Sequence, residues 1–225
     1  MKIVTPIALS LFGAVTASPA EIEQRQSCPA VYTFAARETT VPQGYGSAGA
    51  LVYQIKAAFP GSDSDFIVYP ACGGQASCGG VSYSDSERQG TATVVKVVTA
   101  YNAKCPSTQI ILVGYSQGGQ IMDNAMCGGS GEQLSGAALA AVKVAIFMGD
   151  PHNVAGLPYN VGTCKAGGFA ARPSNFVCAN ASKIQSYCDE ADPYCCKGND
   201  YATHQGYVKK YGSQAITFIK SKITA

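Results

Sequence analysis

The sequence has no tryptophan, only two histidines and few charged side chains. Aspartate, glutamate, lysine and arginine together make up 13% of the 225 residues, and the formal net charge is +2. The chain also lacks a run of basic residues, so its composition argues against nucleic acid and against an anionic membrane surface as partners. A neutral substrate fits this composition better.

Long hydrophobic runs are scarce as well, and the one at the N-terminus is typical of export. Residues 1–17 combine Lys2 with an apolar run and small residues at its end, which predicts a secretory signal peptide. Residues 18–25 are polar, and we interpret them as a pro-segment that precedes a single domain over 26–225. The sequence after residue 17 holds no apolar run long enough to span a bilayer. In an exported chain, the Asn-Ala-Ser sequon at Asn180 predicts glycosylation.

Cysteine, in contrast, is abundant: the chain has ten, all within the predicted mature part. In an exported protein this number predicts up to five disulfides. Zinc binding is the alternative use of so many cysteines, but two histidines offer few further ligands, and the spacing of Cys72 and Cys78 suits a small disulfide loop better than a metal knuckle. We therefore expect neither a metal nor a cofactor.

The hydrophobic pattern alternates between strand and helix periods along the chain. It predicts strands at 30–35, 65–69, 109–114, 142–148 and 183–187, and helices at 45–58, 86–102, 117–126 and 205–222. Such alternation indicates an α/β fold, a three-layer α/β/α sandwich around a doubly wound, mostly parallel five-stranded sheet. Sheets of this kind bind their ligands at the carboxyl ends of the strands.

One serine lies at such a strand end. Residues 110–126 read IILVGYSQGGQIMDNAM, in which Ser116 is the serine of a G-x-S-x-G motif. In this motif a strand turns sharply into a helix and presents the serine hydroxyl above the sheet, and the glycines make room for the close backbone approach. The strand before Ser116 and the amphipathic stretch after it supply the context that the motif requires. The pattern predicts Ser116 as a nucleophile.

A serine nucleophile needs a base, and histidine suits this role because its side chain titrates near neutral pH. Only His152 and His204 are present. His204 follows the last predicted strand and comes just before the last predicted helix, where an α/β-hydrolase carries its catalytic histidine. We therefore predict His204 as the base and interpret His152 as a structural residue.

The acid that orients the histidine is harder to choose from the residues alone. Asp192 lies between Cys188 and Cys195, and a loop pinned by cysteines offers the rigidity that an orienting carboxylate needs. Asp150 ends a predicted strand and stays a rival. Asp200 is expected to cap the last helix or to face solvent. The spacing gives Asp192 only a modest preference.

Several segments together resemble a known family. GYSQGG, CDEADPYCC, ATHQGY, ACGGQASCGG and SCPAVYTFAARETT are similar to the fungal secreted acetylxylan esterases of the cutinase-like carbohydrate esterase family, carbohydrate esterase family 5. The similarity covers essentially the whole predicted mature chain. It implies a cutinase-like α/β-hydrolase without a lid, with Ser116 as nucleophile, Asp192 as acid and His204 as base.

The resemblance also implies the oxyanion hole and the disulfides. Donors to the oxyanion would be Thr39 and the main-chain N–H of Gln117, whose side chain is not required for this role. The implied disulfides are Cys28 with Cys105, Cys72 with Cys78, Cys127 with Cys178, Cys164 with Cys196, and Cys188 with Cys195. Segment 127–141 is shorter than the loop that usually follows the nucleophile helix in the family. This difference bears on how the polysaccharide binds and not on the triad.

The function implied by the resemblance is that of a secreted, monomeric serine esterase that removes acetyl groups from acetylated xylan through an acetyl-enzyme. A cutinase acting on longer acyl chains is the nearest alternative, and ten cysteines argue against it. The second alternative is a carbohydrate-binding or effector protein with an inactive hydrolase fold. The intact set of serine, aspartate and histidine argues against this alternative. Tyr194, two residues after Asp192, is predicted to close the acyl pocket; the alternative is a core tyrosine under the loop.

Overall fold

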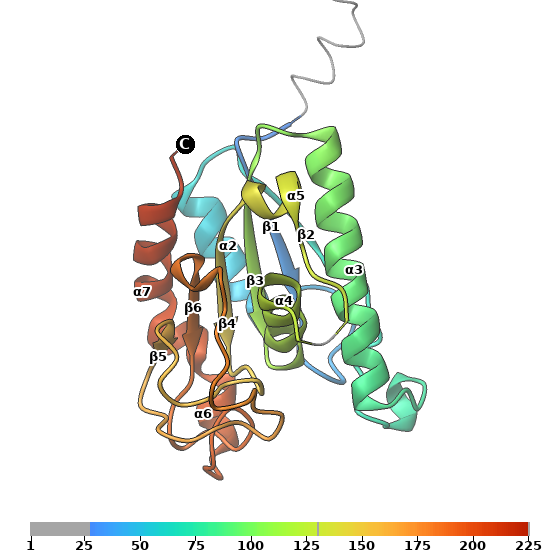
Figure 1. The fold of residues 1–225 in the computed structure, drawn as a ribbon, viewed down its shortest axis with the longest axis vertical. Coiled ribbons are helices and arrows are strands. Elements are labelled where there is room, and N and C mark those ends of the chain that lie inside the picture. The colour runs from blue at the N-terminus through green and yellow to red at the C-terminus, as the bar shows by residue number, and fades with distance from the viewer. Residues whose placement is uncertain (1–27, 130, 225) are drawn as a thin grey trace, which may run out of the picture.

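The computed structural model describes residues 28–129 and 131–224. The predicted signal peptide 1–17 and pro-segment 18–25 lie outside the described residues and stay predictions. Within the described residues, one sheet is covered by helices on both faces (Figure 1). The predicted three-layer α/β/α sandwich is confirmed.

The sheet has six strands in the order β2-β1-β3-β4-β6-β5, and neighbouring strands pair in parallel. The strands are β1 (Val31–Ala36), β2 (Asp63–Phe66), β3 (Gln109–Tyr115), β4 (Val142–Met148), β5 (Asn160–Val161) and β6 (Ile184–Tyr187). The prediction of a five-stranded sheet was therefore wrong by one strand. The extra strand, β5, has two residues, too few to carry an alternating pattern.

The described residues form six α-helices and three 3₁₀ turns. They are α2 (Gly49–Ala58) with the 3₁₀ turn η1 (Gly46–Ala48) before it, α3 (Tyr83–Lys104), α4 (Gln117–Cys127), α5 (Gly136–Ala141), α6 (Tyr201–Gln205) and α7 (Tyr207–Lys222), with further 3₁₀ turns η2 (Ala76–Cys78) and η3 (Ala181–Lys183). The sequence predicted neither α5 nor α6. In the described part of the chain, no helix is both long and apolar enough to cross a membrane.

Two hydrophobic cores lie on opposite faces of the sheet. On β3, Ile110 and Leu112 pack into the core under α3, α4 and α5, whereas Ile111 and Val113 pack into the core under α2 and α7. Figure 1 shows the same division of the helices between the two faces. Because β3 is buried on both faces, it reads as a continuous apolar run, as central parallel strands do. This rigid strand leads directly to Ser116.

Candidate active site

Ser116 lies at a strained turn between β3 and α4. Its backbone has φ 53° and ψ −121°, a conformation that non-glycine residues rarely adopt. A Cβ on Gly114 would lie 2.3 Å from the carbonyl oxygen of Gly118, and a Cβ on Gly118 would lie 2.2 Å from that of Ala36. Both positions therefore require glycine. This is the strand, turn and helix geometry that the motif predicts around Ser116.

The imidazole of His204 lies at the same edge of the sheet. The main-chain N–H of Ser116 donates to the carbonyl of Met148 (2.8 Å), and a Cβ on the next residue, Gly149, would lie 2.7 Å from His204 Cε1. The hydroxyl of Tyr115 donates to the carbonyl of His204 (2.7 Å). Among the described residues no hydrogen bond joins Ser116 Oγ to His204, and this bond is often long in enzymes without substrate. The ends of β3 and β4 thus bring the serine and the imidazole together.

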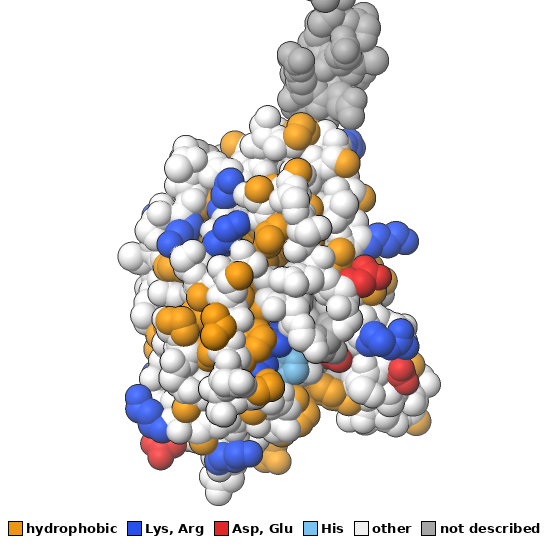
Figure 2. All heavy atoms as spheres, in the orientation of Figure 1, with side chains coloured by type: hydrophobic (Ala, Val, Ile, Leu, Met, Phe, Trp, Pro, Cys, Tyr) orange, Lys and Arg blue, Asp and Glu red, His pale blue; other side chains and the backbone are white. Residues whose placement is uncertain are grey.

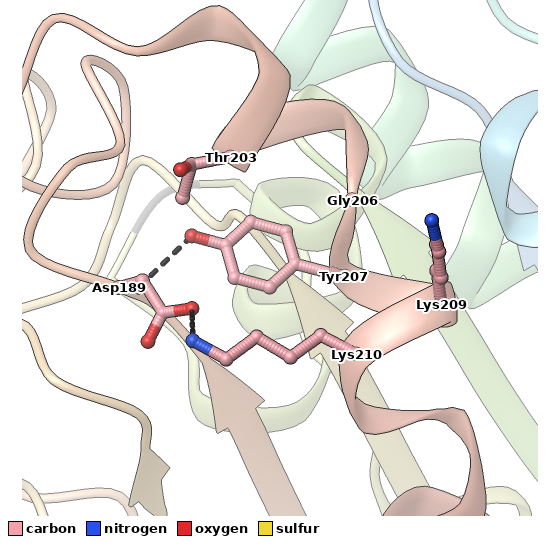
Figure 3. Close-up of a pocket in the computed structure, with 6 residues that line it drawn as sticks. All are labelled: Asp189, Thr203, Gly206, Tyr207, Lys209 and Lys210. Atoms are coloured by element: carbon pink, nitrogen blue, oxygen red, sulfur yellow. Dashed lines mark hydrogen bonds and ion pairs between the residues drawn. The ribbon is translucent and has the colours of Figure 1, made fainter.

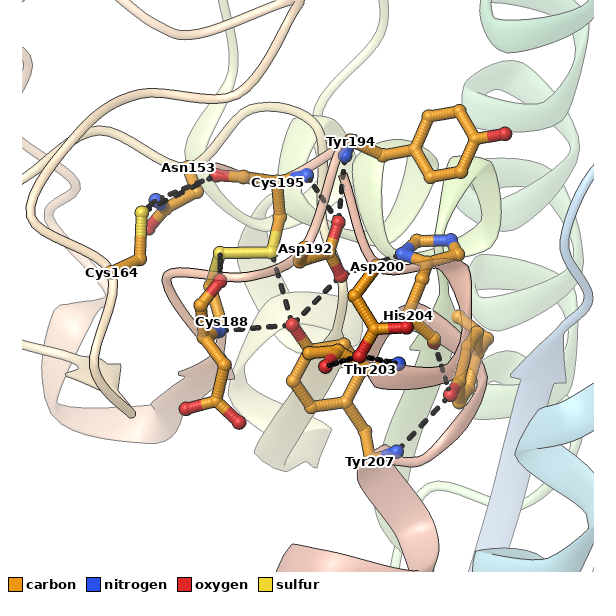
Figure 4. A network of polar contacts seen from close by, with 12 residues as sticks. Asn153, Cys164, Cys188, Asp192, Tyr194, Cys195, Asp200, Thr203, His204 and Tyr207 are labelled. Carbon is orange, nitrogen blue, oxygen red and sulfur yellow. Dashed lines mark hydrogen bonds and ion pairs between the residues drawn. A yellow bond between two sulfur atoms is a disulfide. The ribbon is translucent and has the colours of Figure 1, made fainter. Parts of the chain in front are cut away.

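Asp192 holds the imidazole from the other side. Its Oδ2 atom lies 2.7 Å from His204 Nδ1, and its Oδ1 atom accepts the main-chain N–H groups of Tyr194 (2.7 Å) and Cys195 (3.0 Å) (Figure 4). The carboxylate is fully buried. Burial acts to raise the pKa of the Asp192 carboxyl, but the hydrogen bond and charge of His204 and the two main-chain donors outweigh it, so this pKa lies below its ordinary value. An ionised Asp192 fixes the ring with its Nδ1–H pointing inward.

Tyr207 is a residue that the sequence analysis did not single out. Its hydroxyl donates to Asp192 Oδ2 (2.8 Å) and accepts the main-chain N–H of Asp189 (2.9 Å). The ring is 1% exposed. It lies on α7, three residues after His204, among apolar side chains at helical spacing, and such a pattern does not distinguish a core ring from one whose hydroxyl is hydrogen-bonded. Through this hydrogen bond Tyr207, the first residue of α7, holds the Asp192 carboxylate in place.

Asp189 anchors the same loop against α7. Its carboxylate accepts from Lys210 Nζ (2.7 Å), the Tyr211 hydroxyl (2.8 Å) and the main-chain N–H of Thr163 (3.1 Å). Figure 3 shows Asp189 facing both the Tyr207 hydroxyl and the Lys210 side chain, and all three residues line a surface pocket. Burial acts to raise the pKa of the Asp189 carboxyl, but these donors outweigh it and hold the pKa below its ordinary value.

This depressed pKa predicts a loss of stability in acid. A carboxyl whose pKa is lower in the folded than in the unfolded state stabilises the fold above the unfolded value, about 4, and loses that contribution as pH falls through the folded value. We expect Asp189→Asn to lower the free energy of unfolding by about 1–3 kcal/mol at pH 7 and by much less at roughly pH 2. Urea denaturation across this range measures both. Glu190→Gln, at the exposed neighbour, is the control, and an Asp189→Asn deficit that is the same at both pH values would contradict the assignment.

The rival residues Asp150 and His152 contact each other instead. Asp150 is buried at the end of β4, and its Oδ1 accepts the main-chain N–H of His152 (2.8 Å). Burial and the nearby charge of Asp123 raise the pKa of Asp150 well above its ordinary value. The His152 ring meets the carbonyl of Ala170 (2.6 Å) and the side-chain oxygen of Asn124 (3.0 Å). These contacts do not reach His204, and they favour Asp192 and His204 as the catalytic pair.

Gln117 follows the serine as the first residue of α4, and its side chain has a role that was not foreseen. It is fully buried, its Nε2 donates to the carbonyl of Cys72 (3.0 Å), and its Oε1 accepts from the Ser86 hydroxyl (2.9 Å). The Ser86 hydroxyl also accepts the main-chain N–H of Cys72 (2.9 Å). The side chain of Gln117 therefore fastens the elbow to the loop before α3, while its main-chain N–H stays available as the predicted oxyanion donor.

Thr39, the other predicted donor, lies half-buried in the turn after β1. Its carbonyl accepts from the Thr40 hydroxyl (2.6 Å), and the main-chain N–H of Thr40 donates to Ala71 (2.7 Å), which fixes the turn. Since Gly118 packs directly on the carbonyl of Ala36, this turn follows a strand end that touches the elbow. The turn that carries Thr39 therefore follows β1, which lies on the opposite side of β3 from β4.

Tyr194 lies over the His204 ring and is not a core residue. Its ring centroid is 4.5 Å from that of His204, and 37% of its surface is exposed. Figure 4 shows the ring on the outer side of His204, opposite the buried Tyr207. The alternative of a core tyrosine under the loop is wrong, and the ring is in reach of a group that binds at His204.

The five disulfides join the same cysteines that the resemblance implies. They are Cys28–Cys105, Cys72–Cys78, Cys127–Cys178, Cys164–Cys196 and Cys188–Cys195. The last of these closes the loop that carries Asp192. In the described part of the chain, one group of side chains comes close enough to share a metal ion, the sulfurs of Cys164, Cys188 and Cys196, and each of these is already in a disulfide.

Asn180, the residue of the sequon, lies half-buried just before η3. Its side-chain nitrogen, the atom to which a glycan would be attached, donates to the carbonyl of Met126 (2.7 Å). An N-linked glycan leaves one hydrogen on this nitrogen, so the hydrogen bond and a glycan are compatible. Glycosylation of Asn180 stays a prediction.

Comparison with known proteins identifies the family. The model of the family described as Cutinase matches residues 27–223. The chain is 56% identical to Cutinase 11 of Verticillium dahliae, over 97% of this chain and 77% of the relative, and 55% identical to acetylxylan esterase 2 of Talaromyces purpureogenus, over 96% of this chain and 97% of the relative. A solved acetylxylan esterase structure has a TM-score of 0.86 at 57% identity and covers 88% of this chain and 100% of that one. By sequence and by fold, the chain belongs to the cutinase family.

Proposed function

We propose that the protein is a secreted serine esterase that removes acetyl groups from acetylated xylan. The observation that carries the proposal is the buried hydrogen bond between Asp192 Oδ2 and His204 Nδ1, 2.7 Å long, beside the strained turn at Ser116. Relatives that are 55% and 54% identical are named acetylxylan esterases. Members of such a triad act on acyl groups through a covalent serine intermediate.

In the proposed mechanism Ser116 Oγ attacks the carbonyl carbon of the acetyl ester while His204 Nε2 takes its proton. Thr39 and the main-chain N–H of Gln117 donate to the oxyanion, and His204 returns the proton to the departing sugar oxygen. The acetyl group then stays on Ser116 until water, deprotonated by His204, attacks it; His204 returns that proton to Ser116 Oγ as the bond to the acetyl group breaks and acetate is released. Asp192 keeps the ring oriented and stabilises its positive charge in both steps. No step requires a metal or a cofactor.

The names of the relatives do not decide between acetyl and longer acyl groups. A relative named Cutinase 11 is as similar as one named acetylxylan esterase 2. Acyl size must therefore be set by the walls of the site. The Tyr194 ring, 4.5 Å from the imidazole, is a large rigid group held by a pinned loop, and we assign it as the wall that stops the acyl chain after about two carbons.

Opening this wall is expected to change the preferred acyl length. In Tyr194→Ala, each methylene that finds buried apolar surface gains up to about 0.8 kcal/mol of transition-state binding. We expect kcat/KM for butyrate and longer 4-nitrophenyl esters to rise relative to acetate by about fourfold for each methylene that is buried, in the variant and not in the wild type. Tyr53→Ala, an exposed tyrosine on α2, is the matched control.

Two results would contradict the assignment of Tyr194. Equal losses on every chain length would give the ring a packing role, and the acetyl preference would then be set elsewhere. A wild-type enzyme that already prefers long chains would replace the xylan proposal with cutinase activity. The same series of esters, run beside acetylated xylan, is therefore the test of the proposed function itself.

The rest of the molecule is consistent with an extracellular enzyme that acts on a neutral polymer. Five disulfides persist in oxidising compartments. Figure 2 shows charged side chains scattered over one face of the molecule, with neutral and hydrophobic atoms over most of it. We propose that a mature, monomeric catalytic domain begins near residue 26. Intact mass and gel filtration of the exported protein test the start of the chain and the oligomeric state.

A further inference from the structure

Three large aromatic side chains are exposed together beside the candidate active site. Tyr201 is 63% exposed, Phe169 53% and Tyr194 37%. Tyr194 and Tyr201 lie seven residues apart between β6 and α7, and the fold brings Phe169 to them from a distant part of the chain. Single exposed apolar residues are ordinary, whereas a cluster next to a catalytic group marks a binding surface.

The rings form a connected series that passes over the catalytic histidine. The Tyr194 centroid lies 5.9 Å from that of Tyr201 and 6.4 Å from that of Phe169, as well as 4.5 Å from His204. We call Phe169, Tyr194 and Tyr201 the aromatic platform. Tyr194 is its centre, and the two outer rings extend it away from the imidazole.

The backbone holds the platform in place. The main-chain N–H of Phe169 donates to the carbonyl of Tyr194 (3.0 Å), and a Cβ on Gly168 would lie 2.3 Å from the carbonyl of Pro151, so this segment is closely packed. Behind the platform, the Tyr83 ring lies edge-on to Phe169 at 5.2 Å. Tyr201 starts α6, which Asp200 caps. Rings fixed in this way lose little conformational entropy when they bind a ligand.

The chemistry of the platform suits a neutral ligand with flat apolar faces. The carboxylate beside Tyr201 is that of Asp200, and it is occupied by the main-chain N–H groups of Ala202 (3.0 Å) and Thr203 (3.2 Å). A β-linked xylopyranose ring carries its hydroxyls at its edge and C–H bonds on its faces. Those C–H bonds pack against the electron-rich face of an aromatic ring, while a tyrosine hydroxyl hydrogen-bonds at the edge.

We propose that the two outer rings of the aromatic platform, Phe169 and Tyr201, bind the sugar units that flank the acetylated one, so that the xylan chain runs across His204. This inference rests on the proposed function, since it assigns the polymer of that substrate to a surface. It also separates two kinds of recognition. Tyr194 limits the acyl group, and the two outer rings select a polysaccharide over a small ester.

The test compares the wild type with Phe169→Ala/Tyr201→Ala on two substrates. We expect kcat/KM for acetylated xylan to fall about tenfold, mainly through KM, because two stacking contacts are lost. For 4-nitrophenyl acetate, which reaches only the catalytic centre, we expect a fall of less than about twofold by the same argument. Tyr53→Ala, at an equally exposed tyrosine on α2, should change neither value. Thermal unfolding confirms that each variant folds.

Measuring the binding of xylan to the Ser116→Ala variant tests the aromatic platform independently of esterase activity. The platform predicts that Ser116→Ala binds soluble acetylated xylan and that adding Phe169→Ala/Tyr201→Ala weakens the binding about tenfold. Binding that is insensitive to the two rings overturns the inference, whatever the activity. Equal losses on both substrates, or a loss on emulsified long-chain esters without one on xylan, also overturn it. A wild type that binds xylan through these rings but releases no acetate would instead refute the proposed function.

Discussion

Replacing Ser116 with alanine is expected to lower kcat for acetyl esters by about 10⁵- to 10⁶-fold, the loss seen when a catalytic serine is removed from a triad. The physical reason is that no other group at the elbow can accept the acetyl. His204→Ala should cost a similar factor, and the double variant should be no worse than either single one, because nucleophile and base act as one unit. Stopped assays on 4-nitrophenyl acetate measure all three.

The fold should survive these substitutions. The turn at Ser116 keeps the same backbone conformation when the serine side chain is removed. The backbone at His204 keeps its hydrogen bond from the Tyr115 hydroxyl to the His204 carbonyl when the imidazole is removed. Ser213→Ala, at an exposed serine on α7, is the control. Turnover within tenfold of the wild type in Ser116→Ala, with an unchanged unfolding temperature, would remove the serine from the mechanism.

Asp192→Asn is expected to lower kcat by about 10³- to 10⁴-fold. An amide at this position cannot stabilise the imidazolium and can present N–H toward His204 Nδ1, which favours the wrong tautomer. The expected loss is smaller than for the serine because the oxyanion donors and the nucleophile remain. The effect should be on kcat rather than KM, since Asp192 is fully buried and lies behind the ring.

Asp150→Asn is the matched comparison. Asp150 is equally buried, but its raised pKa favours the neutral carboxyl, and an asparagine is close to that form in shape and charge. We expect its kcat to stay within about tenfold of the wild type. If Asp150→Asn loses activity by a thousandfold while Asp192→Asn does not, Asp150 and not Asp192 is the catalytic acid.

The fold was predictable wherever a segment was long and strongly patterned. β3 and β4 are buried on both faces and read as apolar runs, and Val94 and Val98, four residues apart, lie on the buried side of α3. At the edge of the sheet the pattern fails. The predicted strand 65–69 follows the apolar residues, but β2 pairs at Asp63–Phe66, because an edge strand is defined by its hydrogen bonds to β1 and not by its hydrophobicity.

The candidate site was predictable to a similar degree. Chain order gave His204, and a loop pinned by cysteines gave Asp192. Residue spacing does not contain the contacts between distant segments, such as the Tyr207 hydroxyl on Asp192 or the Gln117 side chain on Cys72. His204 also lies in α6, a five-residue helix capped by Asp200, and not in the loop before a long helix. That helix is too short to show a period.

The most direct test of the central claim is to stop the enzyme in acid while it turns over acetylated xylan and to locate the bound acetyl group by peptide mass mapping. We predict a single acetyl group on Ser116, which disappears when substrate is exhausted and is absent from the Ser116→Ala variant. An acetyl group on another residue, or acetate release from xylan by Ser116→Ala at the wild-type rate, would contradict the account.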